Sequence, residues 1–253
     1  MRIELLPSSI PSSANQYLVS FLVNDSIAID AGSIGFLADL RRQEAIRHVF
    51  ITHEHLDHIA SLPIFLENVY APGPDAIELL ASQKVLDFIH ADIFNGRVWP
   101  DFFELSRPDD RFLETTAIEP LVAVQRAGIR LTPVPVSHGI DTLGLIVDDG
   151  RSAVAFPSDT GPTQLLWDTL AGLRNLRAVF LEVSFPAALA DLARMTGHHC
   201  TTSFAEEIRK LSTDARWIIV HRKTRYAAQI AAELEAMRLP NVELVRPGEV
   251  YEF

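Results

Sequence analysis

The chain has 253 residues, of which 48% are hydrophobic and 22% charged, so it can bury the core of a layered α/β protein. Its formal net charge is −11, and its densest basic stretch is only Arg222, Lys223 and Arg225, which argues against an extended nucleic-acid partner. The short, interrupted apolar runs predict no membrane-spanning helix and no membrane partner. We expect no signal peptide, and the single cysteine, Cys200, excludes an intrachain disulfide, so a cytoplasmic location is expected.

The first half of the chain is expected to begin with strands. Short β-prone runs bounded by Ser, Pro, Asn and Asp predict strands at 3–6, 17–23, 26–29 and 49–52. Apolar periodicity predicts helices over 34–41 and 82–94, whereas 98–120 shows no regular pattern. Aromatic residues from Phe94 to Phe103, including Trp99, would either stack on a substrate base or pack in the core or a dimer contact.

The second half again mixes strands and helices. Strands are expected at 129–136, 142–147, 153–156, 178–183 and 217–220, and helices at 163–173, 201–211 and 225–237. No repeat, low-complexity tract or linker interrupts the pattern. The order predicts one domain with strands and helices in both halves, in which two sheets pack together and helices flank them.

Possible metal ligands are densest directly after the strand at 49–52, in the run His53-Glu54-His55-Leu56-Asp57-His58. Side chains alternate along an extended segment, so His53, His55 and Asp57 share a side, and a helix start would bring His58 to the same place. Imidazole and carboxylate together suit zinc, and also manganese or iron. A polar loop with coincidental histidines is the alternative, but it would place three of nine histidines within six residues by chance.

The pattern HxHxDH after a strand resembles the signature of metallo-β-lactamase-fold hydrolases. The longer run from His53 to Leu62 resembles the signature of class II cyclic-nucleotide phosphodiesterases and departs from it at Pro63, where that signature prefers an aliphatic residue. The resemblance implies an αββα sandwich of two mixed β-sheets flanked by helices, in a single domain over 1–253.

The resemblance also implies ligands further along the chain, each at a predicted strand end. His138, Asp159 and His221 match those positions. One metal would be held by His53, His55 and His138, and the other by Asp57, His58 and His221, with Asp159 bridging two divalent ions, most simply zinc. Without the resemblance, His138 could be an ordinary loop histidine, and Asp159 could serve only its own turn. Asp30 would orient a ligand histidine or, alternatively, occupy a simple turn.

The run Gly197-His198-His199-Cys200-Thr201 resembles the Gly-His-x-Ser/Thr loop of phosphodiesterase members of that superfamily. There the histidine faces the metals and acts on the leaving group, so His198, together with Asp57 and Asp159, is a catalytic candidate. The alternative is that Thr201 or Thr202 caps a helix while both histidines face solvent. We expect Cys200 to be a small packed residue.

The expected activity is metal-dependent hydrolysis of a small anionic phosphodiester, 3′,5′-cyclic AMP or another cyclic nucleotide, by attack of a metal-bridging hydroxide. Processing of tRNA 3′ ends and hydrolysis of a thioester, lactone or lactam remain alternatives, as does a fold member that binds without catalysis. A homodimer is compatible with the sequence.

Overall fold

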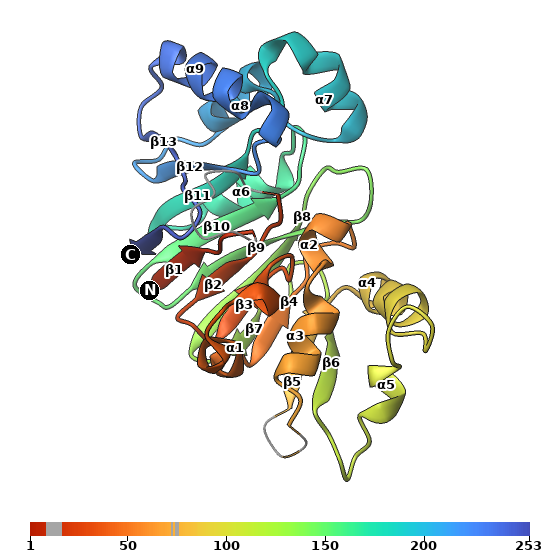
Figure 1. The fold of residues 1–253 in the computed structure, drawn as a ribbon. Coiled ribbons are helices and arrows are strands. Elements are labelled where there is room, and N and C mark those ends of the chain that lie inside the picture. The colour runs from red at the N-terminus through yellow and green to blue at the C-terminus, as the bar shows by residue number, and fades with distance from the viewer. Residues whose placement is uncertain (9–16, 72, 74–75) are drawn as a thin grey trace. The chain divides into compact units, whose positions relative to one another are not determined.

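The computed structural model describes residues 1–8, 17–71, 73 and 76–253, and the chain forms two compact units. Most of the first unit is Leu18–Glu119, joined by the N-terminal strand and by Pro247–Glu252. The second unit contains Pro120–Arg246. Each unit has its own seven-stranded sheet and helices (Figure 1). The two mixed sheets with flanking helices confirm the expected fold class, and the single domain over 1–253 stays a prediction.

The sheet of the first unit has the strand order β14-β1-β2-β3-β4-β5-β6. Its strands are β1 (Arg2–Leu5), β2 (Phe21–Val23), β3 (Ile27–Ile29), β4 (His48–Phe50), β5 (Ile77–Ala81), β6 (Leu113–Ala117) and β14 (Val250–Glu252). Pairing is antiparallel from β14 to β3 and parallel from β3 to β6. The carboxyl ends of β3 and β4 therefore meet at one edge of this sheet, which is where loops carry functional side chains in such proteins.

The sheet of the second unit has the order β13-β12-β11-β10-β9-β8-β7. Its strands are β7 (Val124–Arg126), β8 (Ile129–Pro135), β9 (Leu143–Asp148), β10 (Ala153–Ser158), β11 (Leu176–Glu182), β12 (Arg216–Val220) and β13 (Val242–Leu244). Pairing is antiparallel from β7 to β10 and parallel from β10 to β13. The strands β8, β10, β11 and β12 all run in one direction, so their carboxyl ends share an edge.

The helices of both units are short. In the first unit they are η1 (Ile34–Phe36), α1 (Leu40–Ala45), α2 (Leu56–Ile59), α3 (Leu62–Asn68), α4 (Gln83–Phe88) continuing as the π-helical η2 (Ile89–Ile93), and α5 (Phe102–Leu105). In the second they are α6 (Leu165–Ala171), η3 (Ala187–Leu189), α7 (Ala190–Thr196), α8 (Thr201–Glu207), η4 (Ile208–Lys210), η5 (Thr224–Tyr226) and α9 (Ala227–Met237). Among the described residues, no helix has the length and apolar character needed to cross a bilayer.

Each unit buries a separate apolar cluster. In the first, Phe65, Phe94 and Phe102 pack with the β-strand side chains, and Trp99 lies against them. In the second, Trp167 and Phe204 pack with Ile219 and the apolar face of α9. Phe94 and Phe102 are buried in this cluster, and Trp99 and Phe103 are partly buried against it, so these aromatic residues follow the core-packing alternative.

Two helix predictions need comment. The helix expected over 34–41 is wrong as a single element, because Leu37 is extended and the chain starts a new helix only at Leu40. There Asp39 accepts a hydrogen bond from the backbone N–H of Arg41, which caps α1. The helix over 82–94 is confirmed, with Ser82 as its N-cap. The segment 98–120, which had no regular sequence pattern, supplies α5 and the edge strand β6.

Candidate metal centre

The ligand-rich run of the first unit follows β4 and turns into a helix at His55, which is the N-cap of α2. His53 and His55 therefore precede the helix, while Asp57 and His58 stand on the first turn of α2. The extended alternation expected for His53, His55 and Asp57 is wrong for Asp57, because the helix begins at Leu56. Gly32 allows this packing, since a Cβ there would lie 2.2 Å from the carbonyl oxygen of Asp57. The residue at 32 must therefore lack a side chain.

Asp30 directly follows β3, has a φ of +62° and points its carboxylate at this run. Its Oδ1 accepts hydrogen bonds from the backbone N–H of Thr52 at 2.8 Å and from the Thr52 hydroxyl at 2.9 Å. Its Oδ2 lies 2.7 Å from Nδ1 of His58. A carboxylate only accepts, so Nδ1 carries the proton and the other ring nitrogen keeps a lone pair for a metal. The orienting role expected of Asp30 therefore agrees with its contacts.

The two histidines before the helix are held as a pair. Nδ1 of His53 lies 3.0 Å from the Thr52 hydroxyl, and Nε2 of His53 lies 3.1 Å from Nδ1 of His55. Two nitrogens that bind one tetrahedral zinc at about 2.0–2.1 Å lie about 3.3 Å apart, so this spacing fits a shared ion. A ring nitrogen of His58 and a carboxylate oxygen of Asp57 also lie within 4.8 Å of each other. The sequence-predicted ligands of this unit are thus gathered at one place.

Three strand ends of the second unit carry the remaining predicted ligands. His138 follows β8, Asp159 follows β10 and His221 follows β12. Nδ1 of His138 lies 2.9 Å from the carbonyl oxygen of Gly197, which only accepts, so Nε2 keeps its lone pair. Nδ1 of His221 lies 3.3 Å from Oδ1 of Asp159. The donor set in each unit, imidazole plus carboxylate, suits zinc and other first-row divalent ions.

Backbone strain accompanies these strand ends. Ser158, immediately before Asp159, has a φ of +61°, and His221 itself has a φ of +52°. L-residues rarely adopt this region, and such residues cluster at functional sites because the surrounding structure enforces them. At both positions the backbone turns sharply as it leaves the edge of the sheet.

His198 lies in the same cluster of the second unit, as expected. Its Nδ1 is 2.5 Å from Oε1 of Glu182 and 4.0 Å from Oδ2 of Asp159. Its ring makes an edge contact with His138 at 4.9 Å and stacks on His221 at 5.7 Å between ring centroids. Burial lowers the pKa of His198, but the charge and hydrogen bond of Glu182 outweigh it, so the pKa lies above its usual value. Burial raises the pKa of Glu182, and His198 reverses that shift to a net decrease.

Glu182 and Ser184 were missed by the sequence analysis. Glu182 is the last residue of β11, between β10 and β12, which precede the predicted ligands Asp159 and His221, and it is fully buried. It accepts hydrogen bonds from the backbone N–H groups of Thr160 at 3.1 Å and Ser184 at 3.0 Å. The signal was an acidic residue within the apolar run 178–183, because a carboxylate is rarely buried there without a partner.

The helix-capping alternative for this loop is wrong. Cys200, not a threonine, is the N-cap of α8, and the hydroxyl of Ser203 accepts a hydrogen bond from its backbone N–H at 3.0 Å. Both histidines are buried rather than facing solvent, and burial lowers the pKa of His199. Nδ1 of His199 lies 3.1 Å from the Ser203 hydroxyl. Cys200 is 2% exposed, in agreement with the packing role expected for it.

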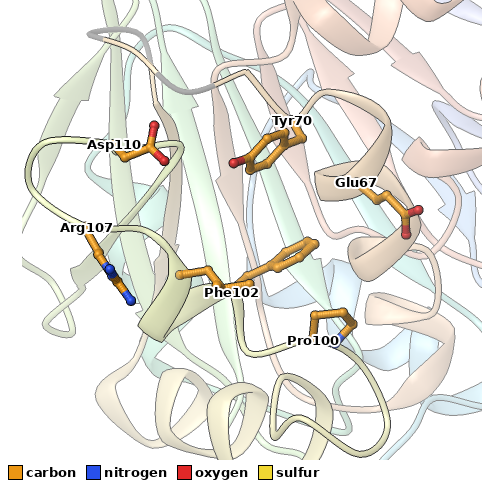
Figure 2. A pocket seen from close by; sticks show the side chains of 7 residues that line it. Glu67, Tyr70, Pro100, Phe102, Arg107 and Asp110 are labelled. Atoms are coloured by element: carbon orange, nitrogen blue, oxygen red, sulfur yellow. The ribbon is translucent and has the colours of Figure 1, made fainter.

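A pocket of about 590 Å³ also lies in the first unit, between the end of α3 and the segment around α5 (Figure 2). Tyr70 and Phe102 face it at its centre, with Arg107 and Asp110 on one side and Glu67 on the other. None of the predicted catalytic or metal-binding residues lines it.

Comparisons with known proteins give a consistent result. A family model described as "Beta-lactamase superfamily domain" matches residues 26–239. A probable 3′,5′-cyclic-nucleotide phosphodiesterase of Yersinia pestis is 27% identical over 239 residues, which cover 77% of this chain and 67% of the relative. Ribonuclease Z of Geobacillus kaustophilus is 25% identical over 245 residues and covers 80% of each chain. The crystal structure of unliganded yeast PDE1 has a TM-score of 0.78 at 16% identity and covers 98% of both chains.

Proposed function

The chain belongs to the β-lactamase superfamily domain family and is a metal-dependent hydrolase of the metallo-β-lactamase fold, and on that premise we propose that it hydrolyses a small phosphodiester, with 3′,5′-cyclic AMP or another cyclic nucleotide as the specific substrate. The similarity to a protein named as a cyclic-nucleotide phosphodiesterase supports this choice.

The observation that carries the proposal is the position of His198. It stands within 4.0 Å of the predicted ligand Asp159 and is held by the buried carboxylate of Glu182 at 2.5 Å. Hydrolysis of a lactam, lactone or thioester uses metal ligands of the same kind, but an alkoxide leaves phosphorus poorly unless it receives a proton. A histidine held in this way therefore favours a phosphodiester over those substrates.

We assign the metals to the ligands that the sequence indicated. One ion would be held by His53, His55 and His138 and the other by Asp57, His58 and His221, with Asp159 as a ligand to both. The tautomers set by Asp30 on His58 and by Gly197 on His138 support this assignment. When bound, such ions lower the pKa of a water molecule and neutralise charge on the phosphoryl oxygens.

In this reaction His198 donates a proton to the leaving oxygen, and Glu182 orients the His198 ring. Glu182 accepts from Nδ1–H of His198, which leaves the Nε2–H of the protonated ring to be donated. As the oxygen of hydroxide bonds to phosphorus, the bond from phosphorus to the leaving oxygen breaks, and the leaving oxygen takes the proton from Nε2 of His198. The proton that water releases in forming hydroxide restores the ring, and Asp159 and Asp57 would be metal ligands at the reacting centre.

One set of assays tests the proposal. After bound metal is measured, the protein is assayed with bis-p-nitrophenyl phosphate, cyclic nucleotides, a glutathione thioester and a lactam. We expect activity on the phosphodiesters, and His198→Ala should lower kcat for cyclic AMP by about 10²–10⁴-fold while the metals stay bound. His90→Ala, which changes a partly exposed histidine of the first unit, is the control. Activity on the thioester or lactam alone would contradict the proposal.

Processing of tRNA 3′ ends is the second candidate, because the similarity to a ribonuclease Z covers 80% of each chain. The net charge of −11 weighs against it, since a protein that holds an RNA backbone gains much of its affinity from basic groups. Cleavage of a precursor tRNA at a rate exceeding that for cyclic nucleotides would favour this candidate.

A further inference from the structure

His198 is carried by an excursion of the chain between β11 and α8, which we define as residues 186–199. The two ends of this His198 excursion are joined by backbone hydrogen bonds. The carbonyl oxygen of His199 accepts from the N–H groups of Ser184 at 3.0 Å and Phe185 at 3.2 Å, and the N–H of Thr201 donates to Phe185 at 3.1 Å. The excursion contains η3 and α7, and Figure 1 shows α7 beyond the strand ends, near α8 and α9.

A single side chain from another helix holds both ends of the excursion. Oε2 of Glu233, on α9, accepts a hydrogen bond from the backbone N–H of Ala187 at 2.8 Å and one from the hydroxyl of Thr201. Ala187 lies just after the start of the excursion, and Thr201 just after its end. The other carboxylate oxygen accepts from the side-chain amide of Gln229 at 2.9 Å, which orients the group.

The helix that carries Glu233 is itself fixed to the core. Ile230 and Leu234, on either side of Glu233, are buried in the apolar cluster of the second unit. Glu233 therefore ties the excursion to a rigid element. The apolar cluster around the excursion is small: its buried residues are Phe185, Ala193 and Cys200, of which only Ala193 belongs to the excursion. Loss of the carboxylate would leave the N–H of Ala187 and the hydroxyl of Thr201 without this acceptor.

We propose that Glu233 is a positioning residue that sets where His198 stands relative to Glu182 and Asp159. This inference rests on the proposed function, in which His198 donates a proton to the leaving oxygen. The proton must travel a short, directed path, and a misplacement of about 1 Å can cost about 10²-fold in rate. Glu233 bonds to Ala187, Thr201 and Gln229 and would therefore act on the reaction through His198.

The experiment compares four variants of the full chain loaded with metal. Glu233→Ala removes the acceptor, Glu233→Gln keeps an oxygen that can accept from Ala187 and Thr201, and Thr201→Val removes one of the two donors. Glu235→Ala, an exposed acidic residue on the same helix, is the matched control. For each, kcat is measured with cyclic AMP, whose leaving group is an alkoxide, and with bis-p-nitrophenyl phosphate, whose leaving group needs no proton.

We expect Glu233→Ala to lower kcat for cyclic AMP by about 10- to 100-fold and for the p-nitrophenyl ester by less than about 3-fold. Thr201→Val should give a smaller selective loss, and Glu233→Gln and Glu235→Ala should match the wild type within about 3-fold. Equal losses on both substrates, or no rescue by Glu233→Gln, would overturn the positioning role, because a merely structural defect does not depend on the leaving group.

Amide hydrogen exchange over 186–200 provides a readout that needs no activity. Exchange should become faster in Glu233→Ala and remain unchanged in Glu235→Ala, and unchanged exchange in Glu233→Ala would refute the inference. If the wild type hydrolyses neither diester, the proposed function fails, and the exchange result alone then decides whether Glu233 holds the excursion.

Discussion

Two of the candidate ligands, His58 and His138, are hydrogen-bonded to groups that decide which nitrogen of the imidazole ring carries the proton. Asp30 holds Nδ1–H of His58, and the carbonyl of Gly197 holds Nδ1–H of His138. In both cases an acceptor-only oxygen leaves the opposite nitrogen with its lone pair. Such partners commonly contribute about 10- to 100-fold to metal affinity.

Replacing Asp30 by Asn tests this dependence. Asn tolerates the positive φ at this position, so the backbone should keep its path. The amide can still accept from Thr52, but its NH₂ group facing His58 would favour the tautomer that cannot bind metal. We expect metal affinity to fall by about 10- to 100-fold and the metal-free protein to lose about 1–3 kcal/mol of unfolding free energy.

The measurements are metal titration and urea unfolding. Asp39→Asn serves as the control, because Asn also caps a helix well, and it should change neither quantity appreciably. Wild-type metal affinity in Asp30→Asn would show that Asp30 is only a turn residue.

The candidate site is built from the ends of strands and helices. The predicted ligands stand at the carboxyl ends of strands, and α7 is capped by Gly197, whose φ of +68° is the left-handed conformation typical of a helix C-cap. A Cβ on Gly197 would lie 2.9 Å from the N of Gly139 and 3.0 Å from Cα of His138. The helix end is therefore packed directly against a ligand-bearing loop of the same unit.

Comparing Gly197→Ala with Gly150→Ala separates this packing from conformational strain. Both glycines have positive φ, but a Cβ on Gly150 would meet no atom within 4 Å. Each substitution should cost about 1–2 kcal/mol for the left-handed backbone, and Gly197→Ala should cost about 1–3 kcal/mol more for overpacking. Equal urea midpoints for the two variants would mean that the backbone at Gly197 can move away from His138 and Gly139 without cost.

At the scale of the whole chain, the C-terminal residues return to the first unit after the second is complete. The strand β14 pairs with β1, so Tyr251 lies opposite Ile3, and Tyr251 is 4% exposed whereas its neighbour Val250 is 43% exposed. The first unit therefore takes its edge strand from the last residues of the sequence.

Tyr251→Ala should consequently lower the unfolding free energy by about 3–5 kcal/mol, the usual cost of truncating a buried aromatic residue. Val250→Ala, on the opposite face of the same strand, should cost less than about 0.5 kcal/mol. Chemical unfolding followed by far-UV circular dichroism measures both. Similar costs for the two would mean that β14 contributes little to the first unit.

The number of phosphate groups that the protein contacts determines how strongly salt affects the reaction. A small diester makes few phosphate contacts, so kcat/KM for cyclic AMP should change by less than about 3-fold between about 50 and 200 mM salt. A nuclease that contacts six or more phosphates would lose about 10³-fold in affinity for its RNA over the same range of salt. A steep fall with salt would favour the RNA candidate over the cyclic nucleotide.

Elements with strong periodicity were predictable from the sequence, and irregular ones were not. The helix at 82–94 and the strands from Ile129 onward follow from apolar spacing, because that spacing is what their burial requires. The strand β6 was not recognised, since its residues are largely exposed and show no apolar alternation. Edge strands depend on pairing with a neighbour, which a local pattern does not encode.

The sequence by itself was enough to predict which residue types would bind metal and that they follow strands, because a run such as His53 to His58 has few other physical explanations. It also determined that His198 belongs with the predicted ligands, through its resemblance to a known loop. Only the tertiary structure brought Glu182 to within 2.5 Å of His198 and Asp30 to within 2.7 Å of His58. These contacts join residues 16 and 28 positions apart. The parallel pairing of β3 with β4 brings Asp30 to His58, and the return of the 186–199 excursion to the end of β11 brings His198 to Glu182.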